Sequence, residues 1–232
     1  YRGWTERSCT PEETLERIEK FVPDAGITRV ADITDLDRIG IPVYSCIRPA
    51  AAEGAISVYN GKGGTEAEAK VAGIMEGIER YSAEAVPRDL APYSYAAMRL
   101  NGEKPIDPES LILPVTTDST QDIPWVKGFD LVSQEEVSVP FCAVVHPNPY
   151  YMPTLFRSSS NGVASGNTLE EAIFYALTEL IERDAWSLAE VTRNTGKKLT
   201  DLPLKVAEMA AKFTDAGVEV TLRDITSDIG VP

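Results

Sequence analysis

The strongest constraint on the fold is an internal repeat of two 22-residue segments. Residues 63–84 read GGTEAEAKVAGIMEGIERYSAE, residues 166–187 read GNTLEEAIFYALTELIERDAWS, and an offset of 103 gives eight identical positions. The matched pairs are Gly63/Gly166, Thr65/Thr168, Glu68/Glu171, Ala69/Ala172, Glu76/Glu179, Ile78/Ile181, Glu79/Glu182 and Arg80/Arg183. Each segment has helical periodicity. We therefore expect two helices that start alike, at residues 65 to about 86 and 168 to about 193.

The repeat keeps three glutamates on one helix face. At about 100° per residue, the three fall within an arc of about 80° in each copy. They are Glu68, Glu76 and Glu79 in the first copy and Glu171, Glu179 and Glu182 in the second. One acidic face is most often solvated surface, whereas a register kept in two diverged copies favours a common ligand. Mg²⁺ binds a few carboxylates together with water and substrate phosphates. The alternatives are thus a solvated surface and two acidic helices around a metal-bound polyphosphate.

A glycine-rich turn precedes each acidic helix. The turns read NGKGGT at 60–65 and NGVASGNT at 161–168, and free N–H groups at a helix start favour anions. Neither turn matches the Walker A pattern. Lys62 in the first turn either reaches a phosphate or is a surface residue. Together with the carboxylates, the turns favour a nucleotide that is held largely through metal ions.

Composition excludes several classes of protein. The net charge of −14 argues against a nucleic-acid partner, because phosphate binding needs clustered Lys and Arg. Three distant cysteines make neither a disulfide framework nor a C-x-x-C pair, and one histidine rules out a His-rich zinc site. No apolar run approaches 18 residues and no signal peptide opens the chain, so we expect a cytoplasmic protein without a membrane partner.

The remaining pattern predicts an α+β fold with mainly antiparallel sheet. Pro11 and a preceding Thr10 mark a helix start. Short strands are expected before the first acidic helix, and residues 87–124 are expected to be irregular, with a short helix at best. Further expected elements are a hairpin at 123–147 with its turn at SQEE, a helix before Gly217 and a strand after Gly217. The chain starts without Met and ends after an apparent strand, so we expect a segment of a longer protein.

Three blocks of the sequence resemble the YcaO family. Two are GKGGTEAEAKVAGIMEGIERYSAE and SNGVASGNTLEEAIFYALTELIERDA, and the third is RSCTPEETLERI, in which Arg7, Pro11 and Thr14 match the pattern R-x-x-x-P-x-x-T. The resemblance implies a YcaO-type fold with two internally related halves around a central nucleotide cleft. Residues 1–232 would be a partial domain, with halves at about 27–100 and 123–232. The C-terminal part of the family domain, with a further nucleotide-site arginine, would follow Pro232.

The resemblance also implies ATP- and Mg²⁺-dependent activation of a peptide-bond carbonyl. In YcaO enzymes the amide oxygen attacks the γ-phosphate of ATP while a nucleophile adds to the carbonyl carbon. Positions that match the family's motifs imply a set of acids that bind metal and nucleotide and a set of further residues that contact the nucleotide. The resemblance names no catalytic residue. The acids are Glu76, Glu79, Glu171, Glu179 and Glu182, and the contacts are Arg7, Thr14, Asn167 and Arg183. Glu68 joins the metal-binding set only through the repeat, and Arg80 is equally well explained as a salt-bridge partner.

The stretch IGIPVYSCIRPAAAEGAISVYNGKGGTEAEAK is similar to YcaO proteins of methanogenic archaea. Those proteins are linked to thioamidation of a glycine in methyl-coenzyme M reductase, often with a TfuA partner and a source of sulfide. Peptide thioamidation is therefore the first interpretation. Azoline-forming cyclodehydration of a ribosomal peptide is the second, and a non-catalytic Mg-ATP-binding scaffold is an alternative of another class. The oligomeric state stays open, a homodimer included.

Overall fold

The computed structural model describes residues 6–84 and 90–231. The chain divides into two compact units, which are described separately. The first unit comprises residues 1–50, 56–79 and 161–232, and the second comprises 51–55 and 80–160. The first unit therefore contains the whole second copy of the repeat and most of the first. These boundaries differ from the predicted halves at 27–100 and 123–232, which remain a prediction.

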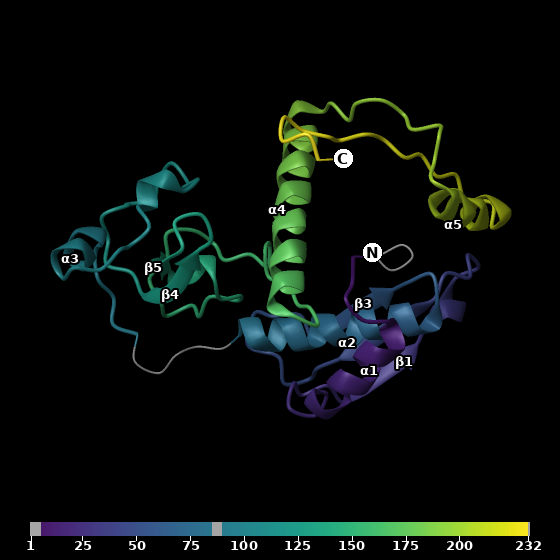
Figure 1. Cartoon of the computed structure of the whole chain (residues 1–232), viewed down its shortest axis with the longest axis horizontal. Coiled ribbons are helices and arrows are strands. Elements are labelled where there is room, and N and C mark those ends of the chain that lie inside the picture. The colour runs from purple at the N-terminus through teal and green to yellow at the C-terminus, as the bar shows by residue number, and fades with distance from the viewer. Residues whose placement is uncertain (1–5, 85–89, 232) are drawn as a thin grey trace. The chain divides into compact units, whose positions relative to one another are not determined.

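A three-stranded antiparallel sheet forms the base of the first unit. Its strands β1 (Arg29–Asp32), β2 (Val43–Ile47) and β3 (Val58–Lys62) lie in chain order. Helices α1 (Pro11–Ile18) and α2 (Glu66–Ala83) pack with this sheet (Figure 1). The shared core consists of Ile18, Ala25, Ile27, Cys46, Tyr59 and Ile74. The predicted strands and both helices are confirmed.

The start of α1 follows the sequence signal closely. The Thr10 side chain accepts a hydrogen bond from the Glu13 N–H, and the Glu13 carboxylate accepts one from the Thr10 N–H. This reciprocal pair is a capping box, which satisfies N–H groups that have no partner inside the helix. A 3₁₀ turn at Glu19–Phe21 continues α1.

Close contact between α2 and β3 depends on two glycines. A Cβ atom placed on Gly61 would lie 2.1 Å from the Ala69 carbonyl oxygen and 2.1 Å from the Gly73 nitrogen. A Cβ on Gly73 would in turn lie 3.1 Å from the Gly61 nitrogen. The backbones of the strand and the helix therefore touch, and only residues without a side chain permit that approach.

Two further helices complete the first unit: α4 (Leu169–Thr192) and α5 (Leu204–Asp215). The strand predicted after Gly217 is wrong, because the described residues 218–226 form no strand. This segment makes one isolated bridge, Lys198 to Arg223, flanked by two backbone hydrogen bonds. A strand needs a continuous partner, and the facing segment around Lys198 supplies only this short contact.

The second unit contains the predicted hairpin, β4 (Trp125–Asp130) and β5 (Glu135–Pro140). Its turn covers residues 131–134, two positions before the predicted SQEE. The Asp130 carboxylate accepts hydrogen bonds from the Val132 and Ser133 N–H groups, so the chain reverses directly after Asp130. The middle stretch contains one short helix, α3 (Tyr95–Leu100), as predicted. The core of this unit consists of Met98, Ile123, Trp125, Cys142 and Leu155.

The fold is α+β with antiparallel sheets, which confirms the predicted class. Across residues 6–84 and 90–231, no helix is both long enough and apolar enough to cross a membrane. The expected cytoplasmic location stays a prediction.

Candidate functional site

The two glycine turns start α2 and α4 in the same way. The Glu68 N–H donates to the Thr65 hydroxyl at 3.2 Å, and the Glu171 N–H donates to the Thr168 hydroxyl at the same distance. A Cβ atom on either turn glycine would collide with the first helical turn, 2.4 Å from the Glu68 Cβ in the first copy and 2.7 Å from the Ala172 nitrogen in the second. The first four matched pairs of the repeat therefore build a helix start.

The glutamates within this helix start have different partners. The Glu68 carboxylate accepts hydrogen bonds from the N–H groups of Gly64 at 2.7 Å and Thr65 at 3.1 Å. It completes a capping box inside its own turn. Capping accounts for Glu68 without a cation, and its role as a metal ligand stays a prediction.

In the second copy, Glu171 binds the N-terminal segment. Its carboxylate accepts hydrogen bonds from Arg7 Nη1 at 2.7 Å, from the Ser8 hydroxyl at 2.7 Å and from the Ser8 N–H at 3.1 Å. The Asn167 amide donates a fourth bond at 3.4 Å. Burial by itself would raise the pKa of Glu171, but the hydrogen bonds from Arg7 and Ser8 and the charge of Arg7 outweigh it and lower the pKa to about 2. Glu171 is therefore ionised at all physiological pH values.

Further contacts fix the same segment on the second turn. Arg7 Nη1 donates to the Ser165 carbonyl oxygen at 3.1 Å, and the guanidinium lies 3.5 Å from the centre of the Tyr175 ring. The Thr14 hydroxyl lies 3.1 Å from the Asn167 amide oxygen. Four residues predicted for the nucleotide site are thus neighbours, namely Arg7, Thr14, Asn167 and Glu171.

Carboxylates from both acidic helices reach the second turn. The Ser165 hydroxyl donates to Glu79 of α2 at 3.0 Å, and the Gly162 N–H donates to Glu179 of α4 at 3.2 Å. Turn 161–168 therefore contacts one predicted metal ligand from each copy of the repeat. Arg183 adds a positive charge, because its Nη2 lies 3.6 Å from Glu179.

Three other residues were predicted for the site, namely Glu76, Glu182 and Lys62. Glu76 is half-buried beside the core, where burial and the Glu76 charge, opposed by Arg48, raise the pKa of the Cys46 thiol to about 11. Glu182 and Lys62 are exposed. Their predicted roles in binding metal or nucleotide stay predictions.

Within the described part of the chain, no three His, Cys, Asp or Glu side chains form a ready-made metal cluster. Mg²⁺ needs no such cluster, since it usually binds one or two carboxylates, waters and substrate phosphates. The buried Nε of Arg183 has no hydrogen-bond partner among residues 6–84 and 90–231. A buried N–H donor without a partner is unusual and suits an anionic oxygen. The residues around turn 161–168 therefore fit a metal-bound phosphate group.

Sequence reasoning missed Ser8, Ser165 and Tyr175. Ser165 lies inside the glycine turn that the repeat had already marked. Tyr175 is four residues after Glu171 and thus on the same helix face, which places its ring beside any partner of Glu171. Ser8 has no signal beyond its position next to Arg7.

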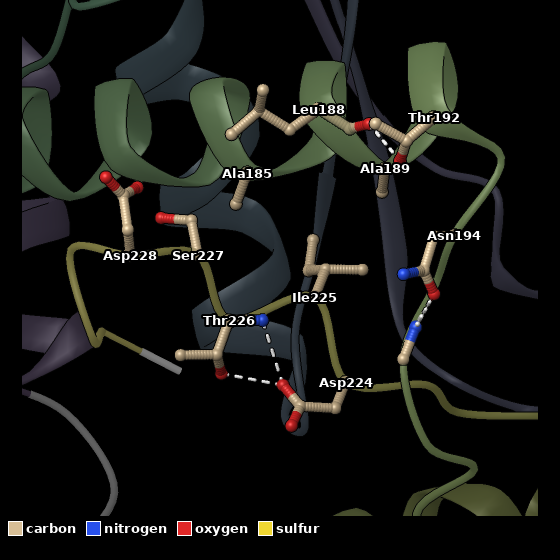
Figure 2. A pocket seen from close by; sticks show the side chains of 11 residues that line it. Ala185, Leu188, Ala189, Thr192, Asn194, Asp224, Ile225, Thr226, Ser227 and Asp228 are labelled. Carbon is tan, nitrogen blue, oxygen red and sulfur yellow. Dashed lines mark hydrogen bonds between the residues drawn. The ribbon is translucent and has the colours of Figure 1, made fainter.

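A separate cavity of about 360 Å³ lies at the C-terminal half of α4 (Figure 2). Ala185, Leu188 and Ala189 of α4 line one side, and residues 224–228 line the other. Asp224 accepts hydrogen bonds from both the N–H and the hydroxyl of Thr226. This cavity is lined by none of the residues predicted for the nucleotide or metal site.

The low pKa of Glu171 predicts a specific loss of stability in acid. Because folding lowers this pKa from 4.5 to about 2, the ionised carboxylate stabilises the protein above about pH 4.5 and ceases to do so as the pH falls through 2. The full contribution of the ionised Glu171 carboxylate to the free energy of unfolding is about 3 kcal/mol.

We expect the unfolding free energies of the protein and of Glu171→Gln to converge between pH 4.5 and 2. Urea titrations across this pH range measure the unfolding free energies. The control is Glu170→Gln, which changes the exposed neighbour and should still lose the stabilisation from Glu171 as the pH falls. A constant difference between protein and variant would contradict the assignment.

Comparison with known proteins identifies a family. The family model described as YcaO cyclodehydratase, binding ATP and Mg²⁺, matches residues 60–232. A protein of Methanothermobacter thermautotrophicus, itself described as uncharacterised, is 47% identical over 97% of this chain and 59% of its own length. An uncharacterised protein from the tfuA 3′ region of Rhizobium leguminosarum bv. trifolii is 34% identical over 98% of this chain and 55% of its own length. The chain thus spans somewhat more than half the length of these curated relatives.

Solved structures give the same result. YcaO from Methanopyrus kandleri, bound with AMPPCP and Mg²⁺, matches with a TM-score of 0.73 at 27% identity, over 93% of this chain and 54% of that chain. A heterocyclase in complex with substrate and cofactor gives a TM-score of 0.81 at 23% identity over 99% of this chain and 35% of that one, which is a likeness of fold. The fold and the extent of the family match are those of a YcaO protein. This chain belongs to the YcaO family.

Proposed function

We propose that the protein uses Mg-ATP to activate a peptide-backbone amide and that it installs a thioamide. The observation that supports a nucleotide site is the position of turn 161–168, which hydrogen-bonds to Glu79 of α2 and to Glu179 of α4. The buried Nε of Arg183, which has no hydrogen-bond partner in the described part of the chain, adds a donor suited to a phosphate oxygen. The family description and the AMPPCP and Mg²⁺ bound to the Methanopyrus protein support the choice of ligand.

In this proposal the chain holds and orients the triphosphate. Glu76, Glu79, Glu179 and Glu182 bind Mg²⁺, which when bound neutralises phosphate charge. Arg7, Thr14, Asn167 and Arg183 contact the nucleotide, and Lys62 reaches a phosphate from the first turn. Phosphoryl transfer needs chiefly positioning and neutralisation of charge, and carboxylates with bound metal and arginines supply both.

The proposed reaction uses one ATP for each amide. The amide oxygen forms a bond to the γ-phosphorus as the bond between that phosphorus and the bridging oxygen of ADP breaks. Hydrosulfide adds to the carbonyl carbon through its sulfur. Phosphate then leaves with the former amide oxygen, and the sulfur proton is lost. The products are the thioamide, ADP and phosphate, with no change that needs an external oxidant or reductant.

Two observations favour sulfide as the nucleophile. One relative comes from the tfuA 3′ region, and another comes from Methanothermobacter thermautotrophicus. A glycine of methyl-coenzyme M reductase is accordingly the proposed target, with a TfuA-like partner and a sulfide source. The family description as a cyclodehydratase favours the second candidate, in which a Cys, Ser or Thr side chain attacks the same carbon and an azoline forms.

Mass spectrometry of a peptide substrate separates these functions. The protein is incubated with Mg-ATP and either a glycine-containing peptide plus sulfide or a cysteine-containing peptide without sulfide. Thioamidation exchanges oxygen for sulfur in the first peptide, whereas cyclodehydration removes water from the second. Both should require ATP and release phosphate in proportion to product. Binding of Mg-ATP without any change in peptide mass would favour the non-catalytic scaffold and overturn both enzymatic functions.

A further inference from the structure

The only histidine of the chain, His146, lies in a loop that is fixed to the end of α2. Its N–H donates a hydrogen bond of 3.0 Å to the carbonyl oxygen of Ala83, the last residue of that helix. At the other end of the loop, the Ser158 hydroxyl lies 3.4 Å from His146 Nδ1 and accepts a hydrogen bond of 2.8 Å from the Asn148 N–H. All of these residues belong to the second unit, so the loop has a defined base within one compact body.

Two arginines place positive charge beside this histidine. Arg80 lies near the end of α2, and Arg157 directly precedes Ser158 in the chain. Burial and the charges of Arg80 and Arg157 lower the pKa of His146, while a hydrogen bond with the Ser158 backbone and the charge of Glu84 act in the opposite direction. The imidazole is therefore neutral at physiological pH. The local potential is positive, although the net charge of the chain is −14.

The loop also offers two groups that the described part of the chain leaves without a partner. Arg157 is exposed and forms no ion pair with any of residues 6–84 and 90–231. The amide oxygen of Asn148 is buried and accepts no hydrogen bond from these residues, although the amide nitrogen donates to the carbonyl oxygens of Pro149 at 3.2 Å and Met152 at 3.4 Å. A guanidinium suits an anion, and a buried acceptor suits a ligand that carries a hydrogen.

A small anion that carries a hydrogen is also what the proposed reaction consumes. Hydrosulfide has a charged sulfur and one S–H group, and none of the residues proposed to hold Mg-ATP is a site for it. Short stretches of chain join the loop to two segments of the proposed nucleotide site. Ala83 follows Glu79 by four residues, about one turn of α2, and Ser158 lies three residues before turn 161–168.

We propose that Arg157 and Asn148, beside the ring of His146, bind hydrosulfide, the nucleophile of the proposed thioamidation. This inference rests on the proposed function and gives the sulfide a site in it. Arg157 attracts the charged sulfur, the Asn148 amide oxygen accepts the S–H, and the neutral ring of His146 borders the anion. Chloride carries no hydrogen and would leave the buried oxygen unpaired, so the site should prefer hydrosulfide.

The single histidine makes this binding directly observable. Because His146 is the only imidazole in the chain, a histidine label alone identifies its ring resonances in an NMR spectrum. Sodium sulfide, titrated into labelled protein in mildly alkaline buffer, should move these resonances until they saturate. Sodium chloride at the same concentrations should move them much less. Equal shifts with both salts, or no shift with sulfide, would overturn the site.

Variants of Arg157 test the residue that supplies the charge. Arg157→Gln should weaken sulfide binding by about tenfold or more, because it removes a charged donor, and the exposed position should leave the fold intact. Arg157→Lys keeps the charge and should retain most of the affinity. The matched control, Arg99→Gln, removes the charge of another exposed arginine in the second unit and should change nothing. Unchanged sulfide affinity in Arg157→Gln would overturn the site.

Kinetics separate the sulfide site from the function on which it rests. In the thioamidation assay, Arg157→Gln should raise the sulfide concentration for half-maximal rate by about tenfold, while the rate at saturating sulfide and the affinity for Mg-AMPPCP stay unchanged. A lower rate at saturating sulfide without a change in that concentration would contradict a binding role. If the protein binds sulfide beside His146 but never forms a thioamide, the proposed function fails and the sulfide site stands.

Discussion

Replacing Gly61 by alanine is expected to destabilise the protein by more than about 4 kcal/mol, enough to prevent folding of the first unit. The new methyl group would lie 2.1 Å from both the Ala69 carbonyl oxygen and the Gly73 nitrogen. Both atoms belong to the backbone of α2, so no side-chain rotation can relieve the collision. The helix would have to move away from β3 and open the core that includes Tyr59 and Ile74.

Gly64→Ala is the matched control in the same turn. A Cβ atom on Gly64 would meet the far end of the Glu68 side chain at 3.1 Å, which that flexible side chain can relieve. Neither glycine has a positive φ, so backbone strain does not separate the two variants. Urea denaturation followed by circular dichroism measures both. Equal stability of the two alanine variants would show that the contact between α2 and β3 is looser than described.

Glu79→Gln is expected to weaken binding of Mg-AMPPCP by at least about tenfold while the fold stays intact. Glutamine keeps the shape of the side chain and can still accept the hydrogen bond from Ser165. It removes the charge that would bind Mg²⁺, and a neutral amide oxygen is a much poorer ligand for this cation. Titration calorimetry with and without Mg²⁺ measures the effect, which should be confined to the Mg²⁺-dependent part of the affinity.

Two further variants identify the cause of that loss. Ser165→Ala removes the hydrogen bond but keeps the carboxylate, so it should reduce the affinity less than Glu79→Gln. Glu66→Gln removes an exposed charge from the first turn of α2, outside the predicted site, and should leave binding unchanged. If Glu66→Gln and Glu79→Gln were equal in effect, the loss would reflect the total charge of the helix and Glu79 would not be a metal ligand.

Local signals predicted the helices of the repeat well. The helix expected from residue 65 to about 86 is found at Glu66–Ala83, and the one from 168 to about 193 is found at Leu169–Thr192. Apolar spacing and an N-terminal threonine are properties of neighbouring residues, so they need no knowledge of the rest of the chain. The same holds for the capping box at Thr10 and Glu13.

Predictions of strands were less reliable, because a strand depends on its partner. Within residues 6–84 and 90–231, the β-type run after Gly217 forms no strand and makes one isolated bridge, from Arg223 to Lys198, with a backbone hydrogen bond on either side. The hairpin was predicted correctly, yet its turn lies two residues earlier because Asp130 bonds to the N–H groups that follow it. Hydrogen bonding between segments and from side chains to the backbone decides such cases, and periodicity alone does not report it.

The sequence alone determined that two acidic helices start behind equivalent glycine turns, because steric fit and capping within about six residues dictate that start. It did not determine what the glutamates of the two starts do. Glu68 and Glu171 occupy the same position in the repeat, but only Glu171 meets Arg7, 164 residues away in the chain. That contact exists because the N-terminal segment packs on the second copy, and burial then makes the carboxylate depend on the donors that surround it. Tertiary structure thus turned one repeated residue into a helix cap and the other into an anchor.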